Sequence, residues 1–372
     1  MGGDIMKFIV ENSNSNYKDT VLKIINDRKK EIFDFFNEEE IDLTFNIYIY
    51  DSIENLVDGL RKRGFDKDPD YMCACVKDRD KSLNFFEPKD NPSEKEWSKG
   101  EYENVIFHEL VHGIQFTLFG TTPEWLCEGI AKLLDGTYSK GIKWLLENYI
   151  NNRDIPNQSE IENEFGMHDY DSYDYAYIMV SYLIDTMGKD KFIELIRDNK
   201  IDSVKDDLLN KAISYYNNKY FSNYLDKYLD QDIDNPKYLF HGSPKRLFKL
   251  TPMLSHDSDG NIDNIACAVF LFPSFLKSTP YSFKDTIKKY SEGLNWDFDI
   301  PNGDDYPLMK MSNVNINEDM IGYIYVFENC SDIIKDDGTY QYKCYKELVP
   351  IDVIEVCYKD YMKYYEVVSK IV

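Results

Sequence analysis

The N-terminal part of the chain changes repeatedly between helical and strand-like patterns of apolar residues. Residues 17–37 carry apolar side chains at helical spacing, and residues 44–50 alternate between apolar and polar positions as a half-buried strand does. A second helix is predicted over residues 52–63, and two strands joined by a polar turn are predicted over residues 71–76 and 83–86. This pattern predicts a small sheet accompanied by helices.

Helical periodicity dominates the next part of the chain, after a polar, turn-rich stretch at residues 88–100. The predicted helices cover residues 101–119, 123–136, 139–150, 172–187, 189–199, 204–216 and 218–229. We therefore expect the small sheet to be followed by a bundle of helices.

The character of the sequence changes near residues 230–236, which are acidic, lack apolar periodicity and end in a proline. Beyond this stretch the apolar runs are short and β-rich, at residues 266–272, 323–327 and 353–358. The predicted fold class is α+β, with one domain at residues 1–232 and a smaller α+β domain at residues 236–372.

The charge composition changes what the protein is expected to bind. The 372 residues contain 43 Lys and Arg against 67 Asp and Glu, which gives a formal net charge of −24. A field of this sign repels phosphate groups and anionic lipid, so we expect no nucleic-acid partner and no membrane partner. The 15% of aromatic residues supplies enough apolar surface for sizeable cores.

The cysteines and the apolar stretches indicate a cytoplasmic protein. The seven cysteines are an odd number scattered along a long chain, which does not predict a disulfide framework. We expect no secretion signal, because no basic segment followed by an apolar one is visible near the N-terminus. The longest apolar stretch, residues 265–276, is too short to cross a bilayer. The sequence does not specify an oligomeric state.

The strongest chemical signal is the segment His-Glu-Leu-Val-His at residues 108–112, inside a predicted helix. Residues four apart share one face of a helix, so the imidazoles of His108 and His112 can bind one metal ion. Glu109 follows the first histidine and is placed to take a proton from a metal-activated water. Zn²⁺ suits such a site because it binds histidine nitrogen and carboxylate oxygen.

A third ligand is expected from the next helix, since a catalytic zinc typically has three protein ligands and one open position. Thr122 is a plausible N-cap residue and Pro123 a plausible first helical residue, which places Glu128 on the second turn. Glu124 would serve if only charge mattered. Glu128 is favoured because its apolar neighbours indicate the inward face of the helix, and Gly129 permits a close approach of helices.

The segments HELVH and PEWLCEGIA together resemble the gluzincin branch of zinc metallopeptidases, over roughly residues 40–200. The resemblance implies a zincin-like domain, a small sheet plus a helical bundle. It also implies that His108, His112 and Glu128 are zinc ligands and that Glu109 is the general base. The strand at residues 83–86 would be the sheet edge that pairs with an extended peptide substrate.

Gluzincins also use a tyrosine or a histidine to stabilise the oxyanion. The segment YDYAYIMVSYL at residues 173–183 resembles the helix that supplies this group, and Tyr173 matches best by its distance from Tyr182. Tyr177 is a second candidate on the same helix. His168, in the polar loop before it, is a third candidate, as a proton donor.

The C-terminal domain has a fainter resemblance to ADP-ribosyltransferase-like domains. It rests on His241-Gly-Ser and on the later residues 268–273, with Glu347 as the matching acid. The sequence departs from that family where its tyrosine is expected, because Phe270 stands there, and Phe272 replaces a small polar residue. The resemblance implies either NAD chemistry or a recognition module that has lost it.

The function expected from the whole sequence is that of a zinc-dependent peptidase acting on a peptide or protein substrate. Two alternatives remain open. One is an ADP-ribosyltransferase-like effector that acts through the C-terminal domain. The other is a non-catalytic binding protein in which zinc only fixes the helices.

Overall fold

The chain forms two compact units, which are described separately. Unit 1 comprises Met1–Tyr138 and Ile155–Ile213, and unit 2 comprises Ser139–Asp154 and Ser214–Val372. The computed structural model describes residues 6–11, 15–39, 44–64, 74–77, 82–88, 99–136, 141–153, 155–157, 160–161, 171–254, 266–291, 293–300, 307–336 and 340–368. The predicted domain division at residues 232–236 stays a prediction.

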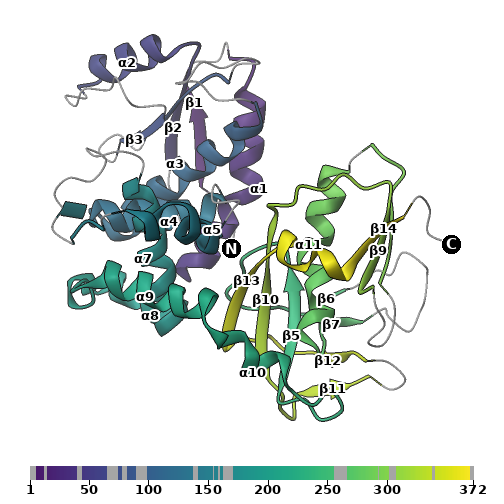
Figure 1. Ribbon diagram of the computed structural model, residues 1–372. Helices are drawn as coiled ribbons and strands as arrows, with labels where there is room; N and C mark the ends of the chain where they lie inside the picture. The colour runs from purple at the N-terminus through teal and green to yellow at the C-terminus, as the bar shows by residue number, and fades with distance from the viewer. Residues whose placement is uncertain are drawn as a thin grey trace. The chain divides into compact units, whose positions relative to one another are not determined.

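Unit 1 contains a four-stranded sheet in the order β1-β2-β4-β3. Figure 1 labels β1, β2 and β3 of this sheet. Its strands are β1 (Lys7–Val10), β2 (Thr44–Tyr50), β3 (Ala74–Lys77) and β4 (Ser82–Phe86). β1, β2 and β4 run parallel, and β3 is antiparallel to β4. The hairpin was predicted, but the expectation that residues 83–86 form the sheet edge was wrong. β4 is paired on both sides, and β3 is the outer strand of the sheet among the described residues.

The alternating pattern of β2 sets which face of this sheet meets the helices. Phe45, Ile47 and Ile49 are buried, whereas the residues between them are half-buried. Helix α3 (Lys99–Phe119) packs against β3, β4 and helix α1 (Lys18–Phe36). A Cβ atom on Gly113 would lie 2.9 Å from the Phe45 ring, so a glycine here lets α3 lie directly on the sheet.

Helix α4 lies between α3 and α7, and its close approach to α7 also depends on a glycine. The helices of this part are α2 (Ile53–Lys62), α4 (Glu124–Asp135), α7 (Asp171–Met187) and α8 (Lys189–Arg197). A Cβ atom on Gly129 would lie 2.5 Å from the backbone oxygen of Ala176. The close helix approach predicted for Gly129 is therefore confirmed, and a larger residue there would push α4 off α7.

The helices that follow differ in part from the prediction. The elements are α5 (Gly141–Asn148), η2 (Ile150–Asn152), η3 (Ile201–Ser203), α9 (Leu208–Phe221), η4 (Asn223–Leu225) and α10 (Asp226–Leu229). The predicted break at residue 217 was wrong, because α9 runs through it. The predicted start at residue 204 was also wrong: Asp207 has a φ of +51°, a left-handed conformation that does not continue a helix.

Unit 2 is built on several small sheets. β5 (Tyr238–Ser243), β10 (Ile321–Glu328) and β13 (Asp352–Cys357) form an antiparallel sheet in the order β13-β10-β5. A second sheet has the order β11-β12-β7-β6, with strands Ile333–Lys335, Tyr342–Cys344, Cys267–Leu271 and Met253–Leu254. A third has the order β14-β9-β8, with strands Tyr365–Val368, Met309–Ser312 and Asp297–Asp299. The α+β fold class is confirmed: a sheet with packed helices is followed by a β-rich part.

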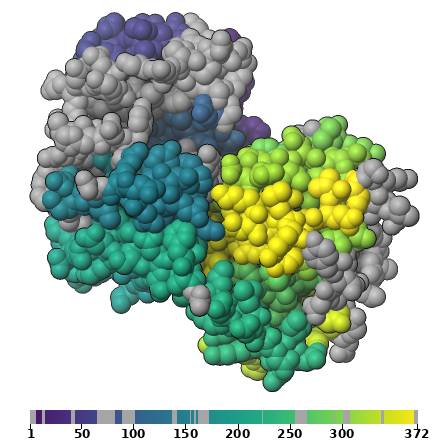
Figure 2. All heavy atoms as spheres, in the orientation of Figure 1, coloured from purple at the N-terminus to yellow at the C-terminus, as the bar shows by residue number. Residues whose placement is uncertain are grey.

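Helix α11 (Phe275–Tyr290) packs closely on β5 and β10 of unit 2. A Cβ atom on Gly242 or on Gly322 would come within 2.2 or 2.3 Å of the backbone oxygen of Ser278 or Ser282, respectively. After β13 the chain continues through α12 (Tyr358–Tyr361) and η6 (Met362–Tyr364) to β14. These last described residues form a continuous yellow region on the surface of unit 2 in Figure 2.

Strand β13 holds the helical segments of unit 2 through buried charge. The Glu355 carboxylate accepts hydrogen bonds from the backbone N–H groups of Ile142 and Lys143 at 3.2 and 3.3 Å, which caps the start of α5. Asp352 pairs with Lys219 of α9 at 2.8 Å and also accepts the hydroxyl groups of Tyr224 and Tyr228. The side chains of Lys219 and Asp352 are only 1% and 7% exposed. The described helical residues 141–152 and 214–229 are therefore parts of the same folded unit as the sheet.

The buried pair predicts a specific loss of stability. Asp352→Asn should lower the free energy of unfolding by about 3–5 kcal/mol at pH 7, because Lys219 stays buried without an anionic partner. Burial acts to raise the pKa of Asp352, but Lys219 and the two tyrosines hold it below its ordinary value of 3.8. The contribution of the Asp352 carboxylate to the free energy of unfolding is therefore complete above about pH 4. It is lost as the pH falls through the folded-state pKa of Asp352. We expect the difference in free energy of unfolding between wild type and Asp352→Asn to become smaller from pH 7 to pH 3. Urea unfolding of both proteins measures this difference.

The matched control is Asp360→Asn in the same unit. Asp360 pairs with Lys143 at 2.7 Å, but these side chains are 35% and 26% exposed. This change should cost less than about 1 kcal/mol. Equal losses of free energy of unfolding in the two variants would show that the buried pair stabilises the unit no more than the exposed pair does.

Candidate metal centre

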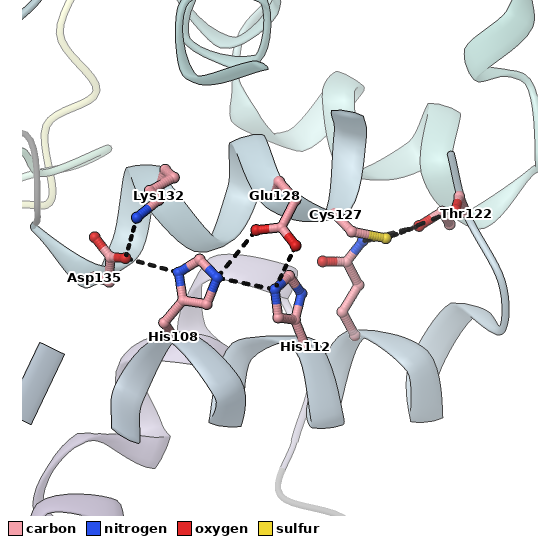
Figure 3. Close-up of polar contacts among 8 residues, drawn as sticks. His108, His112, Thr122, Cys127, Glu128, Lys132 and Asp135 are labelled. Atoms are coloured by element: carbon pink, nitrogen blue, oxygen red, sulfur yellow. Dashed lines mark hydrogen bonds and ion pairs between the residues drawn. The ribbon is translucent and has the colours of Figure 1, made fainter. Parts of the chain in front are cut away.

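Two facing helices of unit 1 bring three candidate metal ligands together (Figure 3). His108 and His112 project from α3, and Glu128 projects toward them from α4. The Nε2 atoms of the histidines are 3.0 Å apart, and they lie 3.1 and 3.4 Å from the two carboxylate oxygens of Glu128. These separations of 3.0 to 3.4 Å fit ligand atoms that share a single ion with bonds near 2 Å.

The local sequence explains why these side chains meet. His108 and His112 are one helical turn apart on α3, and Gly120, with a φ of +69°, ends that helix in a left-handed turn. The expectation for Thr122 and Pro123 was wrong by one residue. Pro123 is the N-cap residue of α4, and the Thr122 hydroxyl instead contacts Cys127 Sγ at 2.9 Å.

The cluster combines two imidazole rings with buried carboxylates. Burial acts to lower the pKa of His108, but its hydrogen bonds to Asp135 and Glu128 raise it to about 10. Burial acts to raise the pKa of Glu128, yet His112 and His108 hold it far below its ordinary value. Glu128 is thus an anion that a proton on His108 can neutralise, and a divalent cation bound in place of that proton would do the same.

Asp135 is a functional candidate that the sequence reasoning missed. Its carboxylate lies 2.8 Å from Nδ1 of His108, and its side chain is 1% exposed. Lys132 lies 3.9 Å from the same carboxylate. A carboxylate behind a histidine fixes the ring so that its Nε2 faces the metal. The available signal was spacing, since Asp135 lies seven residues after Glu128 and so on the same face of α4.

Glu109 is half-buried on α3, beside the three candidate ligands. Burial raises the pKa of Glu109, while the nearby His108 and His112 act in the opposite direction. A raised pKa suits a carboxylate that must accept a proton and release it again near neutral pH. Its assignment as general base stays a prediction.

The candidates for oxyanion stabilisation lie on or before α7. Tyr173 is half-buried, and the Lys132 ammonium lies 5.5 Å from the centre of its ring. Because Lys132 also contacts Asp135, Tyr173 is next to the residues that surround the ligand cluster. Tyr177 is buried at 3% exposure, and His168 lies outside the described residues.

The C-terminal candidates have separate sets of partners. Nδ1 of His241 on β5 donates to the backbone oxygen of Phe270 at 2.8 Å, and burial lowers the pKa of this histidine. Glu347 is exposed and pairs with Lys249 at 3.0 Å. The ADP-ribosyltransferase-like interpretation of residues 236–372 stays a prediction.

Comparison with known families bears on the helices that carry this cluster. Residues 89–222 match the family model of the Peptidase MA superfamily. This part of the chain is therefore metallopeptidase-like. The match includes α3, α4 and α7, and so the whole candidate metal centre. No curated protein matches the chain. Within the described residues, no helix is long and apolar enough to cross a membrane.

The contact between Asp135 and His108 predicts a loss of metal affinity. Asp135→Asn should weaken zinc binding about 10- to 100-fold, because the amide orients the imidazole less strongly and no longer supports its basicity. Competition with a chromophoric chelator measures the dissociation constant. Asp185→Asn on α7 is the control, since it removes a carboxylate outside the ligand cluster and should leave the affinity unchanged. An unaltered affinity in Asp135→Asn would show that this carboxylate does not support the site.

Proposed function

We propose that the protein is a zinc-dependent peptidase that hydrolyses peptide bonds with a metal-activated water. The observation that carries the proposal is the convergence of His108, His112 and Glu128 on facing helices. That cluster lies inside the segment that matches the Peptidase MA superfamily. A structural helix pair has no need to bury two imidazoles against a carboxylate.

Zinc is the metal that this donor set fits best. Two histidine nitrogens and one carboxylate are three ligands, which leaves a fourth position for water or substrate. Bound zinc supplies polarisation of the scissile carbonyl and a water of lowered pKa. The side chains of His108, His112 and Glu128 are 12%, 8% and 17% exposed, so the ligands are shielded while the site stays accessible.

Glu109 would manage the protons of the reaction. Its place directly after His108 on α3 puts it beside the reacting atoms. It takes a proton from the attacking water and later delivers that proton to the leaving nitrogen. Burial, which raises its pKa, supports this double role.

The substrate would be a peptide or protein bound in extended form. Strand β3 packs against α3 and is the outer strand of the sheet in the described part of the chain. An extended segment can add to such an edge through backbone hydrogen bonds. Tyr173 would stabilise the oxyanion, which its position beside Lys132 supports.

The setting of the reaction is proposed from the cysteines and the charge. Among the described residues Cys127, Cys267, Cys330, Cys344 and Cys357 are free thiols, which supports a reducing, cytoplasmic compartment. The net charge of −24 supports a protein that binds neither nucleic acid nor an anionic membrane.

The decisive test is Glu109→Gln. This variant should keep zinc, because no ligand is changed, and should lose hydrolysis by about three orders of magnitude or more, because no base accepts the proton. Zinc content is measured by elemental analysis and cleavage by a peptide library with mass-spectrometric detection.

Two further variants complete that test. Glu103→Gln replaces an exposed glutamate of the same helix and should cleave as wild type does. His112→Ala should lose zinc. Cleavage by Glu109→Gln at the rate of Glu103→Gln would overturn the proposed mechanism.

A further inference from the structure

Two buried polar atoms on α3 lack a hydrogen-bond partner within the described part of the chain. They are Nδ1 of His112 and Oε1 of Gln115. His112 is 7% exposed and Gln115 is fully buried. Buried polar atoms are nearly always paired, so each of these calls for an explanation. The two atoms are complementary: a ring nitrogen can carry a proton, and an amide oxygen only accepts one.

Their positions in the helix make a pairing possible. His112 and Gln115 are three residues apart on α3, and residues at this spacing are neighbours on one side of a helix. A small rotation of the Gln115 side chain changes the position of its oxygen without any movement of the backbone.

The nitrogen of the Gln115 amide already has hydrogen-bond partners. Its Nε2 donates to the Thr122 hydroxyl at 3.0 Å and to Cys127 Sγ at 3.5 Å. The Thr122 hydroxyl oxygen and Cys127 Sγ are in turn 2.9 Å apart. Figure 3 shows this contact. The amide nitrogen thus faces the start of α4. The amide oxygen is available to accept a hydrogen bond from a donor on α3.

Metal binding determines which tautomer of the His112 imidazole must be present. Its Nε2 faces His108 and Glu128, so Nε2 is the atom that offers a lone pair to the ion. Nδ1 then carries the ring proton and becomes a buried donor that needs an acceptor. The corresponding Nδ1 of His108 lies 2.8 Å from Asp135.

We propose that Gln115 is the positioning residue of His112 in the zinc-loaded protein, with its amide oxygen accepting the Nδ1 proton. This inference rests on the proposed zinc site. The ligand histidines then have different supports, a carboxylate behind His108 and a neutral amide behind His112. The amide orients the ring without adding a third negative charge to those of Glu128 and Asp135.

The test uses the full chain, titrated with zinc against a chromophoric chelator. Gln115→Met keeps the length of the side chain but removes the acceptor, and should weaken zinc binding about 10- to 100-fold. Gln115→Glu restores an acceptor and should bind zinc at least as tightly as wild type. Thr117→Val is the control on the same helix. It removes the hydroxyl that donates to the backbone oxygen of Gly113 at 2.8 Å and should leave the affinity unchanged.

A spectroscopic readout separates positioning from a merely structural role. In ¹H–¹⁵N spectra of the zinc-loaded protein, the Nδ1 proton of His112 should be protected from exchange in wild type and in Gln115→Glu. In Gln115→Met it should exchange rapidly. The wild-type spectrum alone tests the proposal if Gln115→Met fails to fold, because an unprotected Nδ1 proton overturns it.

The remaining outcomes also test the role proposed for Gln115. Zinc affinity in Gln115→Met within twofold of wild type overturns the role of Gln115 and leaves the zinc site intact. An equal loss in Gln115→Met and Gln115→Glu overturns it as well. Failure of the wild-type chain to bind zinc contradicts the proposed function itself, and so is distinct from failure of this inference.

Discussion

The candidate metal centre depends on how closely α3 and α4 are held against their neighbours. Each helix carries a glycine directly after a candidate ligand, Gly113 after His112 and Gly129 after Glu128. Gly113 lets α3 lie on the Phe45 ring, and Gly129 lets α4 lie on the backbone of α7. Protein interiors resist even small changes of volume, so these contacts with Phe45 and α7 fix the positions of both helices. Ligand atoms within 4.8 Å of one another require such fixed supports.

The same two helices also carry the groups that we propose orient the candidate ligands. Asp135 lies behind His108, and Gln115, whose amide nitrogen contacts Thr122 and Cys127, is three residues after His112. Ligands and supports therefore come from one continuous stretch of sequence, from α3 through a short loop to α4. A site of this kind needs only two elements in correct register. The rest of unit 1 has to keep that register and to leave one side of the cluster open.

The sequence predicted what depends on spacing within one element. His108 and His112 share one face because a helical turn has a fixed length, and α3 begins within two residues of its predicted start. Glu128 on the next helix was also predicted, because its apolar neighbours indicated the inward face of α4. The sequence missed several other contacts between elements. Asp135 was not singled out in the sequence. Thr122 contacts Cys127 instead of capping α4, and the strand at residues 83–86 is internal because β3 pairs outside it. The start of α9 was misplaced because the left-handed turn at Asp207 has no apolar signature.

The cap that Glu355 forms on α5 has a consequence for biosynthesis. The backbone N–H of Ile142 and its acceptor are 213 residues apart in the sequence. During translation the first turn of α5 therefore waits for its partner until the chain is nearly complete, whereas every residue of unit 1 has been made by Ile213. Because domains generally fold as they emerge from the ribosome, the helices that carry the candidate metal centre can be in place before the second unit closes. The order of synthesis thus favours assembly of the ligand cluster first and docking of α5 onto β13 last.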